Sequence, residues 1–197
     1  MMHTHLRELR DALAGTDVGE VERWAGRAAS ALTSGRRLFA CGNGGSAAEA
    51  QHLTAELTGR FERERGPLSA LALHAETSSV TVIANDYGYQ HVYARQLRAH
   101  ATEGDLLVSL SASGNSQNVV EAVKTAREMG VVSLSLTGPA PSALAALSDE
   151  VVAVPAESTS TVQEVHLVLV HIFCAAVDQG LERIEAPLGA PAPRTEA

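Results

Sequence analysis

Apolar positions in this chain fall into short continuous runs that alternate with longer stretches of helical period. The runs that predict buried strands are residues 37–41, 68–74, 105–110, 131–136 and 150–154. The stretches that predict helices are residues 5–34 (broken at 15–19), 47–57, 87–100, 117–129, 142–147 and 160–181, while the run 80–84 fits either type. This alternation predicts a three-layer α/β/α fold, with about five parallel strands flanked by helices and an N-terminal helical extension.

Two polar turns follow two of the predicted strands. Residues 42–46 read Gly-Asn-Gly-Gly-Ser, and residues 111–116 read Ser-Ala-Ser-Gly-Asn-Ser. Ligands of open parallel sheets bind beyond the carboxyl ends of the strands, where both turns are expected to lie. The pattern therefore predicts a ligand site at that edge.

The serine turn carries hydroxyl groups at Ser111, Ser113 and Ser116, directly before a predicted helix. The unpaired N–H groups and the dipole of a helix start favour an anion, and hydroxyls with free amides can hold a phosphate monoester. Without a Gly-Lys-Ser/Thr sequence, the turn is no Walker A loop. An ordinary serine-rich cap, with Ser116 at the N-cap, is the alternative.

The glycine turn resembles a dinucleotide fingerprint only in part. Ala47 stands where the third glycine of G-x-G-x-x-G belongs, and no acidic residue ends a second strand convincingly. The glycines fit better a turn whose backbone approaches a ligand closely.

Two helices carry side chains that can bind a metal or move protons. His52 and Glu56 are spaced i, i+4, which places them about 40° apart on one helix face. On the last predicted helix, His171 lies about 80° from Gln163, and His166 about 60° the other way. A surface ion pair is the alternative for the first pair. A core histidine bonded to a backbone carbonyl is the alternative for either histidine of the second helix.

Residues 84–88 are predicted to form a polar turn after an apolar run. Asn85 and Asp86 in that turn can bond sugar hydroxyls or simply shape the chain.

Composition narrows the class of protein. The length of 197 residues fits one domain, which we expect over residues 1–184, followed by a flexible Pro/Ala-rich tail at 185–197. The net charge of −8 argues against a nucleic-acid partner. The apolar window 165–177 is too short to span a bilayer, and the charged N-terminus lacks a signal-peptide core. Cys41 and Cys174 are expected to be buried thiols, so a cytoplasmic protein without a membrane partner is predicted.

Taken together, these motifs resemble the phosphoheptose isomerases of the sugar isomerase (SIS) domain superfamily. The resemblance covers roughly residues 5–182 and rests on segments that stand in the family's order: 41–46, 51–60, 84–88, 111–116, 136–138 and 162–171. It implies an SIS-type fold and a homotetramer with active sites at subunit interfaces. The implied reaction converts sedoheptulose 7-phosphate to D-glycero-D-manno-heptose 7-phosphate, the first step toward nucleotide-activated heptose.

The resemblance also implies roles for individual residues. The positions that match ligands of one Zn²⁺ per subunit are His52, Glu56, Gln163 and His171. Glu56 and His171 match the proposed catalytic base and acid, and His166 matches a histidine outside the ligand set. The positions that match substrate contacts are Asn43, Gly44, Gly45, Glu56, Asn85, Asp86, Ser111, Ala112, Ser113, Ser116 and Gln163.

Three positions depart from the family pattern. Ala112 replaces a common threonine and removes one hydroxyl from the phosphate loop, Ser160 replaces an acidic residue, and residues 139–142 replace a glycine-rich turn. The last two departures leave the exact sugar open, so an isomerase of another sugar phosphate is one alternative. A non-catalytic adaptor of the DnaA initiator-associating type, from the same superfamily, is another. The adaptor branch departs from the catalytic pattern at the positions of Glu56 and His171, which this chain keeps.

Overall fold

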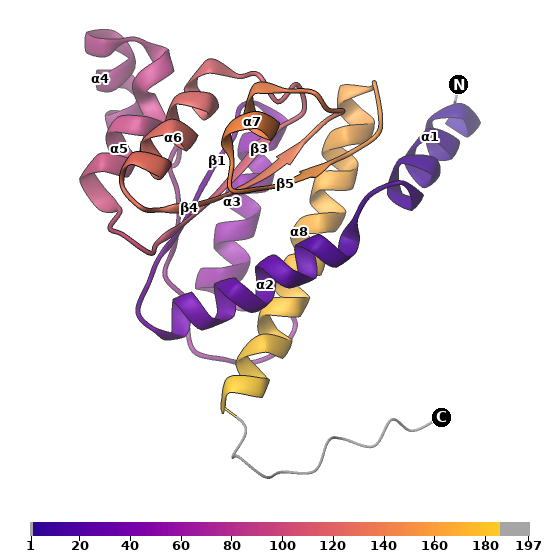
Figure 1. Cartoon of the computed structure of the whole chain (residues 1–197), viewed down its shortest axis with the longest axis horizontal. Helices are drawn as coiled ribbons and strands as arrows, with labels where there is room; N and C mark the ends of the chain where they lie inside the picture. The colour runs from indigo at the N-terminus through magenta and orange to yellow at the C-terminus, as the bar shows by residue number, and fades with distance from the viewer. Residues whose placement is uncertain (1, 186–197) are drawn as a thin grey trace.

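A computed structural model describes residues 2–185 of the chain, and its centre is a five-stranded parallel sheet (Figure 1). The strands are β1 (Leu38–Cys41), β2 (Ala70–Ala72), β3 (Leu106–Ser111), β4 (Val132–Thr137) and β5 (Glu150–Ala153). Their order is β2-β1-β3-β4-β5, and every neighbouring pair is parallel. The predicted strands and the α/β class are confirmed, and the predicted tail beyond residue 185 lies outside the described residues.

Helices cover both faces of the sheet and complete three layers. The helices are α1 (Met2–Ala14), α2 (Val18–Thr33), α3 (Gly45–Thr58), α4 (Thr77–Tyr87), α5 (Val92–His100), α6 (Gln117–Glu128), α7 (Ala143–Leu147) and α8 (Thr159–Glu185), with a short 3₁₀ turn η1 (Tyr89–His91). One buried cluster joins α1, α2, α3 and α8 to the sheet, and a second joins α4 to α7 to the opposite face. Strand side chains alternate between the clusters, as Leu38 and Phe39 of β1 do.

The predicted N-terminal extension is a pair of helices. Asp17 accepts a hydrogen bond from the Glu20 N–H at 3.1 Å and thereby caps α2 after the predicted break. In Figure 1, α2 crosses α8 and α1 projects beyond the sheet. By length and composition, residues Thr159–Ile184 of α8 could cross a membrane, but 56% of their apolar window is buried in the domain. We therefore identify α8 as the core helix of a soluble domain.

One sequence-based prediction is wrong at residues 84–88. Asn85 and Asp86 do not form a turn, because α4 runs from Thr77 to Tyr87 and includes them in its last turn. The Glu76 carboxylate caps this helix by accepting from the Ser78 and Ser79 N–H groups, and Gly88 ends it at φ 93°. The ambiguous run 80–84 is the middle of the same helix.

The strand order places a topological switch between β1 and β3. The chain passes from β1 outward to β2 and then returns across β1 to β3, so the segments after β1 and β3 leave the sheet in different directions. A crevice is expected at such a point, beyond the carboxyl ends of the strands. Both polar turns predicted from the sequence begin there.

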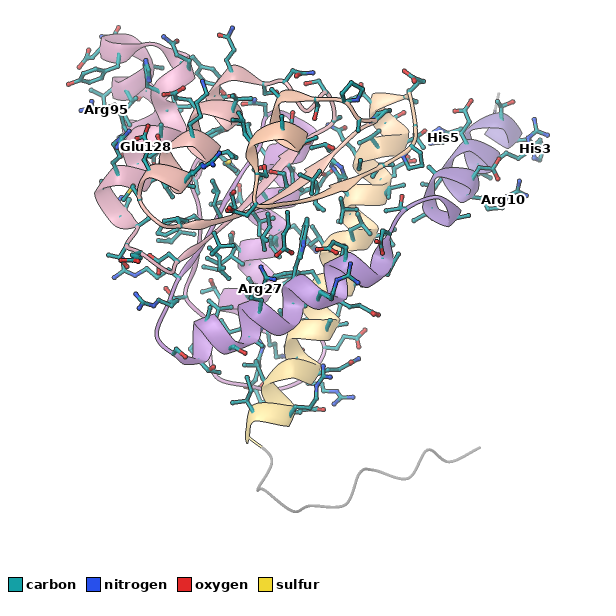
Figure 2. All side chains as sticks on the ribbon, in the orientation of Figure 1. His3, His5, Arg10, Arg27, Arg95 and Glu128 are labelled. Carbon is teal, nitrogen blue, oxygen red and sulfur yellow. The ribbon has the colours of Figure 1, made fainter. Side chains whose placement is uncertain are left out.

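Charged side chains are spread over the surface. Figure 2 labels Arg10 on α1, Arg27 on α2 and Arg95 on α5, which are three separate elements. Arg27 pairs with Glu150, and the guanidinium of Arg95 stacks 3.6 Å above the Tyr87 ring. These arginines are therefore engaged locally rather than gathered on one face.

Candidate active site

The glycine turn after β1 brings the start of α3 against the start of α8. Gly44 adopts φ 56°, which L side chains rarely adopt, and so permits the sharp turn. A Cβ atom at Gly42 would lie 2.6 Å from the Ser46 carbonyl oxygen, and one at Gly45 would lie 2.7 Å from Gln163 Oε1. Glycine is required at position 42 because a Cβ atom there would clash with the Ser46 backbone, while Gly45 lets the Gln163 amide pack directly on the turn.

The serine turn after β3 gathers its hydroxyl groups at the start of α6. Ser111 Oγ lies 3.5 Å from Ser113 Oγ and 3.2 Å from Ser116 Oγ. Ser116 occupies the N-cap position of α6, but its side chain makes no capping hydrogen bond. Its hydroxyl faces the loop instead and caps none of the N–H groups in the first turn of α6, where a helix start lacks intrahelical acceptors.

A pocket of about 190 Å³ lies between the two turns. Its lining residues are Asn43, Ser46, Leu110, Ser111, Ala112, Ser113, Ser116, Thr159 and Gln163. None of these residues is charged, so hydroxyls, amides and backbone groups are the polar atoms that it offers. Six of the predicted substrate-contact positions meet here, while Ser46, Leu110 and Thr159 were missed by the sequence analysis. Ser46 ends the glycine turn and Thr159 begins α8, and both positions could have been inferred from the motifs beside them.

Three of the four predicted metal ligands converge between α3 and α8. His52 Nε2 lies 3.0 Å from His171 Nε2 and 3.4 Å from Glu56 Oε1. The side chains of His52 and Glu56 are 42% and 24% exposed, so solvent or another molecule can reach them. Gln163, the fourth predicted ligand, lines the pocket described above.

These separations fit a divalent metal ion in part. Two atoms bound to a tetrahedral zinc at 2.0–2.2 Å lie about 3.3–3.5 Å from each other. The His52–Glu56 distance matches that value, and the two histidine nitrogens would need to open by about 0.3 Å. Within residues 2–185, however, no group of three or more His, Cys, Asp or Glu side chains is arranged as a complete metal site.

The structure separates the two histidines of α8, which helix geometry alone could not, and it agrees with the resemblance that set His166 apart from His171. His171 faces His52, whereas His166 is fully buried and its Nε2 bonds to the Thr137 carbonyl at 3.2 Å. Burial lowers the pKa of His166 to about 4, so this ring is neutral at physiological pH. His166 is thus a core histidine bonded to a backbone carbonyl.

The predicted substrate contacts at the end of α4 lie outside the pocket. Asn85 and Asp86 are exposed and bonded to each other, with Asn85 Nδ2 donating to Asp86 Oδ1 at 2.7 Å. The segment just beyond them does reach the site, because Tyr89 Oη donates to Asn43 Oδ1 at 3.3 Å. A substrate role for Asn85 and Asp86 stays a prediction.

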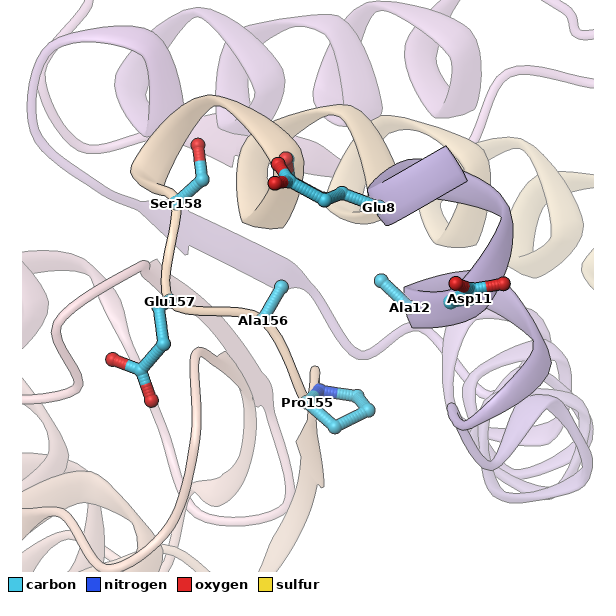
Figure 3. Close-up of a pocket in the computed structure, with 8 residues that line it drawn as sticks. Glu8, Asp11, Ala12, Pro155, Ala156, Glu157 and Ser158 are labelled. Atoms are coloured by element: carbon cyan, nitrogen blue, oxygen red, sulfur yellow. The ribbon is translucent and has the colours of Figure 1, made fainter. Parts of the chain in front are cut away.

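A larger hollow of about 550 Å³ lies between α1 and the segment that leads into α8 (Figure 3). Carboxylates of Glu8, Asp11 and Glu157 line it. Three acidic side chains repel a phosphate group, so this hollow suits the expected anion poorly. The smaller, uncharged pocket is the better candidate for a phosphate-binding site.

Known proteins resemble this chain over most of its length. Residues 3–138 match the SIS domain family. A phosphoheptose isomerase from Streptomyces coelicolor is 55% identical over 183 residues, which cover 92% of this chain and 79% of that protein. A probable phosphoheptose isomerase from Thermoplasma acidophilum is 43% identical, over 89% of this chain and 96% of that protein.

Solved structures agree with these sequence matches. The structure of a phosphoheptose isomerase from Neisseria gonorrhoeae matches with a TM-score of 0.83 at 39% identity, covering 90% of this chain and 95% of that one. A phosphoheptose isomerase from Francisella tularensis matches with a TM-score of 0.84 at 31% identity, covering 90% and 94%. Fold and sequence thus point to the same family.

Proposed function

The chain belongs to the SIS domain family and, within it, to the phosphoheptose isomerases, and from this premise we propose how and where it acts. It is an aldose–ketose isomerase that converts sedoheptulose 7-phosphate to D-glycero-D-manno-heptose 7-phosphate, the first step toward nucleotide-activated heptose. The observation that carries the assignment of the site is the uncharged pocket at the β1/β3 switch, which is lined in part by α3 and α8, the two helices that also carry His52, Glu56 and His171.

The two ends of the substrate have different partners in this proposal. The phosphate binds to the hydroxyls of Ser111, Ser113 and Ser116 and to the free N–H groups of α6, where the helix dipole favours an anion. Ala112 contributes only its backbone there. The carbon chain extends toward Gln163 and the His52–Glu56–His171 cluster, which fixes C1 and C2 in place for reaction.

Isomerisation moves a proton between C1 and C2 through an enediol(ate). Glu56 removes this proton as the base, and His171 serves as the acid that protonates the developing oxyanion. His52 Nε2 lies 3.4 Å from Glu56 Oε1, so the imidazole helps to orient the Glu56 carboxylate. The reaction is complete when Glu56 returns the proton to C2 and His171 takes back a proton from the C1 hydroxyl, which leaves the aldehyde at C1 and restores both side chains.

His52, Glu56, Gln163 and His171 are also the proposed ligands of one zinc ion per subunit. When bound, the ion supplies Lewis-acid polarisation of the substrate oxygens. Two imidazoles, a carboxylate and an amide form a mixed nitrogen and oxygen set compatible with zinc. Because coordination makes a carboxylate a poorer base, Glu56 acts as base either detached or weakly held.

The proposal includes a cytoplasmic homotetramer with active sites at subunit interfaces. Leu167 supports it, because this apolar side chain is 38% exposed and lies one helical turn from both Gln163 and His171. An apolar residue exposed beside the proposed ligands is consistent with coverage by another subunit.

Turnover of sedoheptulose 7-phosphate tests the reaction. The purified protein is incubated with this ketose and, in parallel, with other ketose phosphates, and aldose formation is followed by NMR. We expect the manno-heptose phosphate to form, to stop forming after chelation, and to form again when Zn²⁺ is added.

Three results would contradict parts of this proposal. A folded protein that forms no aldose from sedoheptulose 7-phosphate under any metal condition excludes the proposed reaction. Faster turnover of another ketose phosphate identifies a different sugar while leaving the isomerase class in place. Full activity after chelation, with zinc absent by elemental analysis, excludes the metal.

A further inference from the structure

Two asparagine side chains clamp each other between the glycine turn and the start of α6. Asn43 Nδ2 donates to Asn118 Oδ1 at 2.8 Å, and Asn118 Nδ2 donates back to Asn43 Oδ1 at 2.8 Å. Asn118 is 3% exposed, whereas Asn43 is partly exposed and lines the pocket. The pair therefore joins a buried residue of α6 to the wall of the proposed substrate site.

The backbone of α6 determines which way the pair faces. The Val119 N–H, which can only donate, bonds to Asn118 Oδ1 at 3.0 Å. The oxygen of Asn118 must therefore lie on that side, and its NH₂ group must face Asn43. This in turn fixes the Asn43 amide with its oxygen toward Asn118 Nδ2.

A tyrosine hydroxyl reinforces the same orientation of Asn43. Tyr89 Oη donates to Asn43 Oδ1 at 3.3 Å. Tyr93 Oη also lies 3.3 Å from Asn43 Oδ1, but it donates its single hydrogen to the Gly42 carbonyl. Asn43 Oδ1 thus accepts from Asn118 Nδ2 and Tyr89 Oη. The Asn43 amide nitrogen carries two hydrogens, and it donates one of them to Asn118 Oδ1. Within residues 2–185, no acceptor takes the other.

We infer that Asn118 is a positioning residue that locks the Asn43 amide, so that Asn43 presents an N–H donor to an oxygen of the substrate. This inference rests on the proposed function for the nature of the substrate. Asn118 itself lies outside the pocket lining and acts only through Asn43. Without Asn118, the Asn43 amide can rotate and present its oxygen, which repels a substrate oxygen.

A double-mutant cycle tests this dependence. We expect Asn43→Ala and Asn118→Ala each to lower kcat/KM for sedoheptulose 7-phosphate about tenfold or more, and the double variant to be no worse than Asn43→Ala. Asn43→Asp keeps the shape of the side chain but removes the N–H donor, so it should lose at least as much activity as Asn43→Ala. Additive losses in the double variant, or wild-type activity in Asn43→Asp, would overturn the inference.

Thr125→Val is the matched control for a buried polar change in α6. Thr125 is 1% exposed, lies seven residues after Asn118, and its hydroxyl has no hydrogen-bond partner among the described residues. This variant should keep wild-type kcat/KM. If it loses as much as Asn118→Ala, the effect of Asn118 is a general disturbance of α6.

NMR of the side-chain amides tests the clamp without any turnover. The chain has four asparagines, so selective ¹⁵N-asparagine labelling gives four pairs of side-chain signals. We expect a nuclear Overhauser effect between the amide hydrogens of Asn43 and Asn118, and a shifted Asn43 signal in Asn118→Ala. Absence of the effect overturns the inference, whereas a wild-type protein inactive on the heptulose phosphate overturns only the proposed function.

Discussion

Glu49 and His166 are a buried titratable pair beside the proposed site, between α3 and α8. Glu49 Oε2 lies 3.9 Å from His166 Nδ1, and neither atom has a hydrogen-bond partner among the described residues. Burial raises the pKa of Glu49 to about 7 and lowers that of His166 to about 4. Both groups are therefore favoured in their neutral forms in the folded protein.

Replacement of Glu49 by glutamine should change how stability depends on pH. Because the pKa of Glu49 rises from 4.5 to about 7 on folding, the parent protein loses stability as pH increases across this range. Glutamine cannot ionise and removes that loss. We expect the free energy of unfolding of Glu49→Gln, relative to the parent, to increase by about 1–3 kcal/mol between pH 5 and pH 8.

Urea denaturation at pH 5, 6, 7 and 8 measures the effect. The exposed Glu22 on α2 supplies the control variant Glu22→Gln, whose pH dependence should follow that of the parent protein. A Glu49→Gln curve that also runs parallel to the parent would show that Glu49 ionises normally in the folded state.

At the residue scale, sequence patterns identified the candidate side chains but not the atoms that each of them contacts in the fold. The spacing of His166 and His171 on one helix left both as candidates, and only the fold places Thr137 against the first and His52 against the second. Ser116 was predicted as an N-cap by position, but its hydroxyl turns to Ser111. Contacts between distant segments decided each case.

Among the helices, α3 and α8 carry the proposed metal ligands, and Arg65 braces these two helices together. Its Nη2 and Nη1 donate to the carbonyls of Glu56 and Leu57 at 2.8 and 2.9 Å, at the C-terminal end of α3. Its Nε donates to Asp178 Oδ1 of α8 at 2.8 Å. The Arg65 and Asp178 side chains are only 11% and 9% exposed, so water screens this ion pair weakly.

Arg65→Lys should weaken this brace and, through it, the metal site. Lysine keeps the charge but cannot reproduce the planar fork that reaches both helices. We expect the free energy of unfolding to fall by about 1–3 kcal/mol and zinc affinity to fall about tenfold or more. Chemical denaturation and competition with a zinc indicator measure the two effects.

Arg63→Lys is the matched control for this prediction. Arg63 pairs with Glu182 of the same helix α8, but the two side chains are 64% and 55% exposed. Exposed ion pairs contribute about 1 kcal/mol or less, so zinc affinity should not change. Equal zinc affinities in Arg65→Lys and the parent would exclude a role for the brace in forming the site.

Elements with a clear hydrophobic period were predicted well, and α4 was not. Its central run is short, and Asn85 and Asp86 are residue types that favour turns. Local capping by Glu76 and packing of Ile83 in the second core cluster overcome this preference. Tertiary packing thus determines the helix, which the local sequence alone did not predict.

On the scale of the whole molecule, several large apolar side chains remain at the surface of the single chain. They include Leu71 on the edge strand β2, and Leu167 and Val168 on α8, which are 49%, 38% and 37% exposed. Edge strands and apolar helix faces are commonly covered by another subunit. These residues are therefore candidates for the interface of the proposed tetramer.

A charge placed on this surface should disrupt assembly. Four copies of the 20.6 kDa chain would have a mass of about 82 kDa (4 × 20.6), which light scattering during gel filtration measures. We expect Val168→Glu to elute as smaller species with lower activity, and the isosteric Val168→Thr to remain tetrameric. A parent protein that is monomeric, or a Val168→Glu protein that stays tetrameric, would contradict this interface.

The parallel α/β class was predictable because strands and helices alternate clearly along the chain. The sequence placed the candidate site only at the carboxyl edge of the sheet, and the strand order adds that its two turns lie at the β1/β3 switch. The Asn43–Asn118 clamp was not predictable, since 75 residues separate its members and no periodic pattern connects them. Sequence patterns thus predict the edge of the sheet where the candidate site lies, and the folded chain adds the contacts between residues distant in the sequence.

The central claim is that this chain isomerises sedoheptulose 7-phosphate at the site that contains Glu56. The most direct test compares turnover and ligand binding by the parent protein and by Glu56→Gln under the same conditions, using NMR and calorimetry. We predict that the parent forms the manno-heptose phosphate, and that Glu56→Gln forms none while still binding the ketose. A parent protein without turnover, or a Glu56→Gln variant with near-parental turnover, would contradict the account.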